Sequence, residues 1–144
     1  MILYAMKRVI IIHSDEGNLE PIAEVIRTGL KEEPDRARVE IVSVAACTSP
    51  FSVRPYDLVC IGSPVRGLFG GRIAPDVVNL ISRCNGIEGK RCAVFVTKKL
   101  FGTNKALQQM MALLEKQGAL VQDFDVLSCQ GAEEFGRRLL NLLE

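Results

Sequence analysis

Short apolar runs alternate with segments of helical periodicity along the whole chain, and few folds accommodate this order. Residues 8–12 are mostly β-branched and follow one another without polar alternation, which is typical of a strand buried on both faces. Residues 18–32 then repeat apolar side chains every three or four positions, with Pro21 in the first turn, and predict a helix. Further strands are predicted over residues 39–44, 58–61, 92–96 and 120–127, and further helices over residues 74–83, 104–117 and 133–143.

Strands that alternate with helices in this way predict an α/β architecture. Each connection is long enough for a right-handed crossover, so the strands are expected to run parallel, with helices on both faces of the sheet. The 144 residues are expected to form a single domain with one core. Residues 45–55 are predicted to be a loop or one short helical turn, and residues 1–5 a disordered extension ahead of Met6.

Composition and charge exclude several classes of function. The chain is 48% hydrophobic, with a formal net charge of +1 and no basic stripe, so nucleic acid is not expected as a partner. No apolar run reaches the length of a membrane span, and we expect a cytoplasmic protein, monomeric or homodimeric, that does not bind membranes. Five cysteines without a C-x-x-C spacing and a single histidine, His13, argue against zinc. Cys60 and Cys92 fall in strand-like runs and are expected to be buried.

Ligands of parallel α/β sheets bind outside the carboxyl ends of the strands, where three loops are expected to emerge. The first, residues 13–19, offers the hydroxyl of Ser14 and backbone N–H groups at the start of a helix, which suits a phosphate. It also carries two carboxylates, Asp15 and Glu16, which do not suit a phosphate.

The other two loops offer aromatic and basic side chains. Residues 62–71 contain three further glycines beside Arg66 and Phe69, and glycines allow a planar ligand to approach the backbone closely. Residues 97–103 add Phe101 and the pair Lys98-Lys99. The two phenylalanines are candidate stacking surfaces for a ring.

At this point three segments carry a resemblance to a known family. HSDEGNLEPIAEVI (residues 13–26), YDLVCIGSPVRG (56–67) and KRCAVFVT (90–97) are similar to the flavodoxin family, and the stretch from Tyr56 to Pro64 is the most specific part. The resemblance spans almost the whole chain. It implies the flavodoxin fold, which is a three-layer α/β/α sandwich around a five-stranded parallel sheet in the order 2-1-3-4-5. It also implies FMN as the cofactor, and electron transfer with a redox partner protein or a small quinone-type acceptor.

The same resemblance implies which residues would hold FMN, whereas it implies no metal ligand and singles out no catalytic residue. The implied FMN-binding residues are Ser14, Asp15, Glu16, Gly17, Asn18, Leu19, Ser63, Pro64, Val65, Arg66, Gly67, Phe69, Thr97, Lys98, Lys99 and Phe101.

The chain departs from the family in the first loop, where Glu16 and Leu19 replace hydroxyl residues. A carboxylate about 5 Å from a phosphate charge costs roughly 3 kcal/mol at an effective dielectric near 20. The helix dipole stabilises a nearby phosphate by only about 0.3–1 kcal/mol. If Glu16 points inward, FMN binding is therefore expected to be weakened or lost, unless Lys98, Lys99 or Arg66 offsets the charge.

Two other functions stay open on the sequence alone, and a third is disfavoured. The chain could be a flavin-free flavodoxin-fold module for protein interaction, or an FMN-dependent oxidoreductase acting on a quinone or NAD(P)H. A phosphorylation-dependent receiver domain has the same strand order, and Asp15-Glu16 and Thr97 mimic its acid pair and hydroxyl. Gly62-Ser63, however, stand where a receiver needs its phosphate-accepting aspartate.

Overall fold

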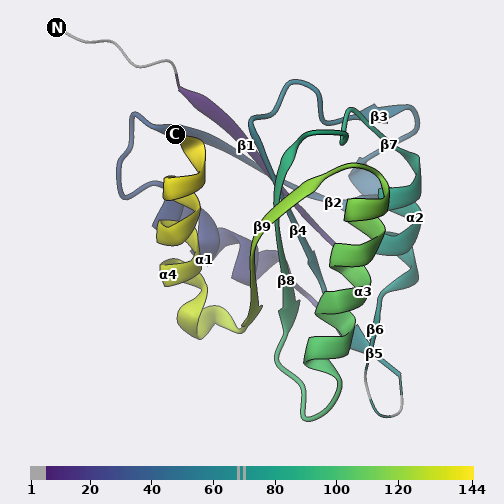
Figure 1. Ribbon diagram of the computed structural model, residues 1–144. Helices are drawn as coiled ribbons and strands as arrows, with labels where there is room; N and C mark the ends of the chain where they lie inside the picture. Colours follow the sequence, from purple (N-terminus) through teal and green to yellow (C-terminus); the bar gives the residue numbers. More distant parts are fainter. Residues whose placement is uncertain (1–5, 68, 70) are drawn as a thin grey trace, which may run out of the picture.

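The computed structural model describes residues 6–67, 69 and 71–144 and contains the expected parallel sheet (Figure 1). Its strands are β1 (Lys7–His13), β2 (Ala37–Ser43), β4 (Leu58–Ser63), β8 (Arg91–Thr97) and β9 (Leu120–Leu127). All neighbouring pairs are parallel, and the strands lie in the order β2-β1-β4-β8-β9. This confirms the predicted order 2-1-3-4-5. Residues 1–5, predicted to be a disordered extension, lie outside the described residues.

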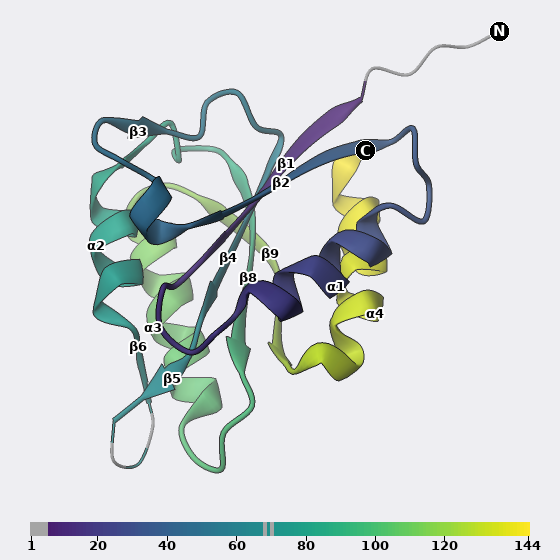
Figure 2. The same cartoon turned by 180° about the vertical axis from the view of Figure 1, so that it is seen from behind.

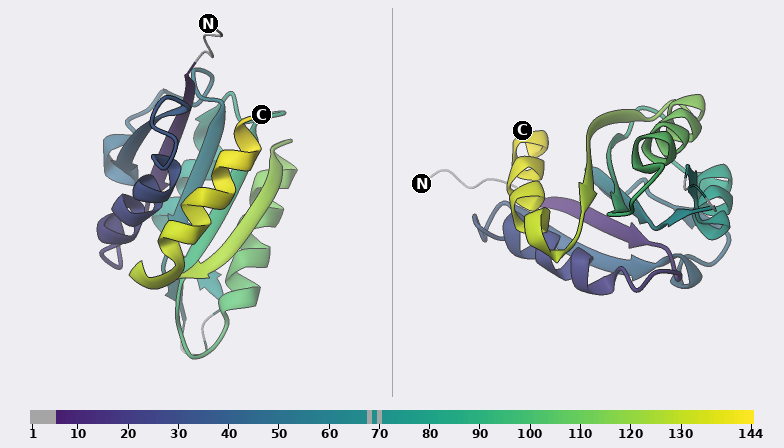
Figure 3. Two further views of the ribbon diagram at one scale, coloured as in Figure 1. Left: turned by 90° about the vertical axis from the view of Figure 1, so that its left-hand side faces the viewer. Right: turned by 90° about the horizontal axis from the view of Figure 1, so that it is seen from below.

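Helices cover both faces of the sheet, which confirms the three-layer sandwich. The helices α1 (Glu20–Leu30) and α4 (Cys129–Leu140) lie on one face, and α2 (Pro75–Arg83) and α3 (Thr103–Lys116) on the other (Figure 2, Figure 3). Side chains of strand β1 belong to both cores, one on each face of the sheet. Ile10 and Ile12 belong to the core that includes residues of α2 and α3, whereas Val9 and Ile11 belong to the core with α1 and α4. This burial on both faces explains why the strand has no polar alternation.

Two helix starts differ from the predictions. Helix α1 begins at Glu20 rather than at residue 18, because Asn18 has a φ of +52°, a left-handed conformation that an α-helix does not contain. Helix α4 begins at Cys129 rather than at residue 133, but Gln130 and Gly131 interrupt it with non-helical backbone. Its regular turns therefore start close to the predicted position, and a 3-10 turn, η2 (Asn141–Leu143), follows.

Two small sheets are not predicted by the sequence. The strands β3 (Phe51–Ser52) and β7 (Cys84–Asn85) pair in parallel, and β5 (Val65–Arg66) and β6 (Arg72–Ile73) pair antiparallel. Strands of two residues are too short to show a periodicity. A 3-10 turn, η1 (Val44–Ala46), agrees with the predicted short helical turn. None of the helices in the described ranges is long and apolar enough to cross a membrane.

Two glycines bring α1 and α4 into backbone contact. A Cβ atom on Gly29 would lie 2.1 Å from the carbonyl oxygen of Glu133, and a Cβ atom on Gly136 would lie 2.2 Å from that of Ile26. Both distances are far below van der Waals contact, so any side chain at either position would push the two helices apart.

Strand β9 ends the sheet, and its polar groups are organised by one arginine. The backbone N–H groups of Phe124 and Val126 each donate to the carboxylate of the preceding residue, Asp123 or Asp125, at 2.8 Å. Arg138 of α4 donates two hydrogen bonds to Asp123, at 3.0 and 3.1 Å, and one to Asp125, at 3.0 Å. The arginine therefore fixes the edge strand to the helix that follows it.

Replacing a helix-contact glycine tests the packing of α1 on α4. Gly136→Ala is expected to lower the free energy of unfolding by at least about 2 kcal/mol, within the usual cost of overpacking a core. Thr28→Ala, at an exposed position of α1, is the control and is expected to change it by less than about 0.5 kcal/mol. Urea denaturation followed by circular dichroism measures both, and equal effects would contradict the close contact.

Candidate functional site

Three loops meet at the carboxyl edge of the sheet, as expected. They follow β1, β4 and β8, which are neighbours in the sheet. The first two loops are in contact, because a Cβ atom on Gly17 would lie 2.9 Å from the Cβ of Pro64. Lys99 joins the second and third loops: its ammonium donates to the carbonyl oxygens of Val65 and Gly67, at 3.1 and 3.4 Å. The residues predicted from three separate stretches of sequence thus lie at one edge.

The first loop has the backbone of a tight turn. Gly17 and Asn18 both have positive φ values, +83° and +52°. The hydroxyl of Ser14 accepts a hydrogen bond from the N–H of Glu16 at 3.0 Å. Such a turn, followed directly by a helix, gathers N–H donors toward one point and is suited to an oxyanion.

A carboxylate of the chain itself occupies this turn. Asp76, in the first turn of α2, accepts hydrogen bonds from the Ser14 hydroxyl at 2.8 and 3.0 Å and from the N–H of Asp15 at 2.8 Å. Asp15 points elsewhere, because its own carboxylate accepts the N–H of Ala45 at 2.8 Å. The Ser14 hydroxyl, one of the donors expected to hold a phosphate, is therefore satisfied by Asp76, a residue that the sequence did not single out.

Glu16 and Leu19, the two departures from the family pattern, take different positions. Glu16 pairs with Arg66 at 2.8 Å, and both side chains are about half exposed. The positive charge of Arg66 is therefore already matched by a carboxylate. The side chain of Leu19 is 1% exposed and lies in the core with α1 and α4. It supplies the loop with no side chain, although the resemblance implied it among the cofactor residues.

The second loop is held by Ser63. This buried hydroxyl donates to the carbonyl oxygen of Pro64 and accepts the N–H of Ala74, both at 2.8 Å. Val65 is also buried. Ser63 and Val65 therefore fix the β5–β6 hairpin onto the sheet, and their side chains do not face a ligand.

The third loop leaves its apolar side chains exposed. Leu100 is 85% and Phe101 56% exposed, and Phe69 of the second loop is 74% exposed. Thr97 is half-buried at the end of β8, and the exposed Lys98 uses its N–H to bind the carbonyl oxygen of Leu127 at 3.2 Å. No ring of the protein covers either phenylalanine within the described residues.

The site lacks an activated nucleophile. His13 is buried, and its Nδ1 donates to the carbonyl oxygen of Ser14 at 2.9 Å. Burial raises the pKa of the Cys92 thiol to about 12 and that of Cys60 further still, so both are protonated at neutral pH and behave as core residues, as predicted. Across the described ranges no group of His, Cys, Asp and Glu side chains could hold a metal ion.

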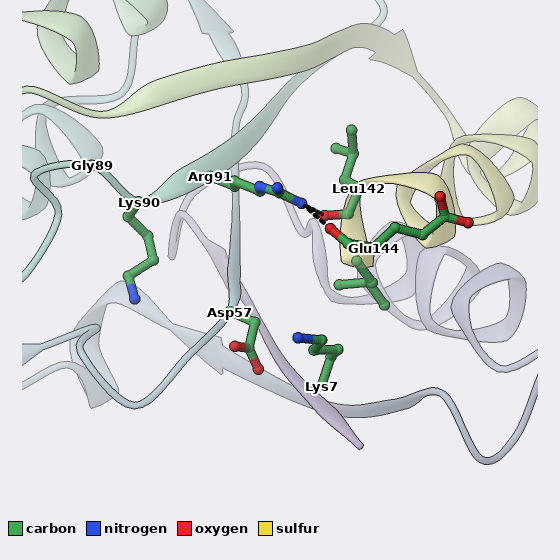
Figure 4. A pocket seen from close by; sticks show the side chains of 8 residues that line it. Lys7, Asp57, Gly89, Lys90, Arg91, Leu142 and Glu144 are labelled. Carbon is green, nitrogen blue, oxygen red and sulfur yellow. Dashed lines mark hydrogen bonds between the residues drawn. The ribbon is translucent and has the colours of Figure 1, made fainter. Parts of the chain in front are cut away.

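A hollow of about 250 Å³ lies at the opposite end of the sheet from the three loops (Figure 4). The guanidinium of Arg91 donates there to the carbonyl oxygens of Leu142 and Glu144, at 2.6 and 2.7 Å. Charges of both signs line this hollow, including Lys7 and Asp57. Because charges of both signs are present, the hollow favours neither an anion nor a cation. Arg91 joins Leu142 and Glu144 to strand β8.

Comparison with solved structures decides the fold family. No protein-family model matches the chain, and no curated protein matches its sequence. A flavodoxin from the domain Archaea matches with a TM-score of 0.73 at 16% identity, over 94% of this chain and 98% of that one. The chain has the flavodoxin fold. A flavodoxin from Megasphaera elsdenii (TM-score 0.70, 20% identity, 92% and 98% covered) and Flavodoxin 1 from Bacillus cereus (0.67, 18%, 94% and 96%) match similarly.

The first loop of this flavodoxin-fold protein does not fit the phosphate of FMN as the structure arranges it. The Ser14 hydroxyl and the Asp15 N–H already bind Asp76. Two unit negative charges about 4 Å apart repel by about 4 kcal/mol at an effective dielectric of 20, and a phosphate carries nearly two. The favourable interaction of a phosphate with the start of a helix amounts to only about 0.3–1 kcal/mol. A phosphate would therefore have to displace Asp76 before it could bind.

The contribution of Asp76 to the loop can be measured as stability. Asp76→Ala removes the acceptor of the buried Ser14 hydroxyl and of the exposed N–H of Asp15, and is expected to lower the free energy of unfolding by about 1–3 kcal/mol. Asp35→Ala removes an exposed carboxylate that has no hydrogen-bond partner among the described residues, and is expected to change it by less than about 0.5 kcal/mol. If chemical denaturation gave both variants the same stability, Asp76 would not hold the loop.

Proposed function

We propose that this flavodoxin-fold protein works without FMN and binds another protein through the loops at the carboxyl edge of its sheet. The observation that carries the proposal is the position of Asp76. From within the same chain, its carboxylate binds the Ser14 hydroxyl and the N–H of Asp15 and places a negative charge at the loop where a flavin phosphate would lie.

The space between the second and third loops supports the same function. Phe69 and Phe101 were expected to cover a ring there, yet Lys99 spans the two loops through the carbonyl oxygens of Val65 and Gly67. The exposed side chains Phe69, Leu100 and Phe101 form what we name the loop patch. Large apolar side chains gathered at one exposed edge are typical of surfaces that bind other proteins.

A second candidate function is the FMN-dependent electron carrier, with a redox partner protein or a small quinone-type acceptor. The left-handed turn at Gly17-Asn18 favours it, because this turn gathers donors for an oxyanion. Among the matching solved structures is a Fusobacterium nucleatum flavodoxin mutant bound to flavin mononucleotide, at 11% identity and a TM-score of 0.62. For this chain the candidate requires Asp76 to turn away from Ser14.

A flavin titration separates the two candidates. The wild-type protein is expected to leave the fluorescence of both FMN and riboflavin unchanged, because the Asp76 carboxylate lies at the Ser14 hydroxyl and Lys99 spans the loops. The double variant Asp76→Ser/Glu16→Thr removes both carboxylates and is expected to bind FMN at least about 100-fold more tightly than the wild type, from the loss of roughly 3 kcal/mol of repulsion.

Riboflavin serves as the control ligand, because it lacks the phosphate and gains nothing from the double substitution. Saturable binding of FMN by the wild type, tighter than that of riboflavin, would establish the electron-carrier candidate instead. Equal binding of both flavins would place the ring, but not the phosphate, in the site.

Comparative capture tests the role of the loop patch. Proteins retained by the immobilised wild type are expected to be lost with Phe69→Ser/Phe101→Ser. They are expected to stay with Phe124→Ser, which removes a phenylalanine of β9 whose exposure, 53%, is close to that of Phe101. Quantitative mass spectrometry of the three eluates measures this. Retention of the same proteins by all three would remove the loop patch from the interaction.

A further inference from the structure

The β5–β6 hairpin sets two arginines side by side. Val65 pairs with Ile73, and Arg66 pairs with Arg72, in an antiparallel register. Residues directly opposite each other in such a pair project their side chains on the same face, with Cβ atoms about 4.5–5.5 Å apart. Like charges in this arrangement are destabilising unless an anion lies between them.

Both arginines line one hollow. Its volume is about 270 Å³, and Gly67, Ile73 and Pro75 complete the lining. Ile73 is buried and Pro75 opens α2, so the floor of the hollow belongs to the packed part of the domain. Both arginine side chains are exposed. A small ligand can therefore reach both guanidinium groups from solvent.

The charge around the hollow is positive. Lys99 binds the carbonyl oxygens of Val65 and Gly67 in the same hairpin, and a Cβ atom on Gly71 would lie 3.1 Å from Cδ of Lys105. Among the described residues, one carboxylate pairs with a cation of this group: Glu16 forms an ion pair with Arg66. Arg72 has no carboxylate partner among the described residues.

The carboxylate of Asp76 already has hydrogen-bond partners elsewhere. Asp76 follows Pro75 in the chain, but it binds the hydroxyl of Ser14 and the N–H of Asp15. Among the described residues Arg72 therefore has no counterion, whereas the donors of the first loop have the carboxylate of Asp76.

We propose that the hollow between Arg66 and Arg72 binds a small molecule through a doubly charged oxyanion, a phosphate or a dicarboxylate. Guanidinium groups present planar pairs of N–H donors that match such anions with two parallel hydrogen bonds. An anion there replaces the Glu16 carboxylate on Arg66 and gives Arg72 the counterion that it lacks among the described residues. The proposal does not depend on whether the protein binds FMN, because it involves neither the Ser14 hydroxyl nor the N–H of Asp15.

Nuclear magnetic resonance with inorganic pyrophosphate and with succinate tests the site. Each is added to 15N-labelled protein at constant ionic strength, and the Nε–Hε signals of arginine and the backbone signals of Arg66 and Arg72 are followed. At least one probe is expected to shift these signals saturably. The probe that binds tighter tells a phosphate site from a carboxylate site.

Two variants make the test specific. Arg72→Gln is expected to weaken binding at least about tenfold, because it removes charge-assisted hydrogen bonds. Arg38→Gln removes an exposed arginine of β2 that has no hydrogen-bond partner among the described residues, and is expected to leave binding unchanged. The proposal is overturned if neither probe gives a saturable shift, if Arg72→Gln binds like the wild type, or if the shifts centre on Ser14 and Asp15.

Discussion

Burial of the central strands on both faces of the sheet is the constraint that decides where their polar side chains lie. All residues of β4 are buried, and β1 and β8 are less buried only at their ends, so these strands present polar side chains where they begin or end. At the amino end of the sheet, polar side chains link neighbouring strands. The Asp57 carboxylate accepts the N–H of Arg8 at 2.8 Å, and the Tyr56 hydroxyl donates to Glu40 at 2.6 Å, which holds the pKa of that carboxyl below its usual range. At the carboxyl end, by contrast, the loops leave side chains exposed to solvent.

The main strands and helices could be predicted because each is long enough to show its period. β1 is apolar without interruption from Val9 to Ile12, and α1 repeats its apolar side chains along one face. The hairpin of β5 and β6 could not, since each strand has two residues. The pairing of Arg66 with Arg72 depends on that hairpin, and so the juxtaposition of two arginines is absent from any local pattern.

Asp76 was missed for a different reason. It follows Pro75 at the start of a helix, where an acidic residue is common because it complements the helix dipole. Nothing at that position signals a hydrogen bond to Ser14, 62 positions earlier in the chain. One signal could have pointed to it: the carboxylates in the first loop made a phosphate improbable there, and the turn still needed an acceptor.

Much of the most specific motif of the sequence serves the packing of the sheet. Tyr56 and Asp57 act at the amino end of the sheet, far from the loops, and Ser63 fixes the N–H of Ala74. A chain can therefore keep these residues for its fold while its first loop changes. The match to the family in this stretch predicts the fold, which the packing roles of these residues explain.

The arrangement of β9 has a consequence for how copies of this protein meet. The free edge of a sheet normally invites a strand from another molecule. Here an incoming strand would have to displace Asp123 and Asp125 from the N–H groups of Phe124 and Val126, and Arg138 holds both carboxylates in place. Two copies placed edge to edge would also bring four carboxylates together. The β9 edge is therefore closed to extension, and copies of the protein do not join into a continuous sheet through it.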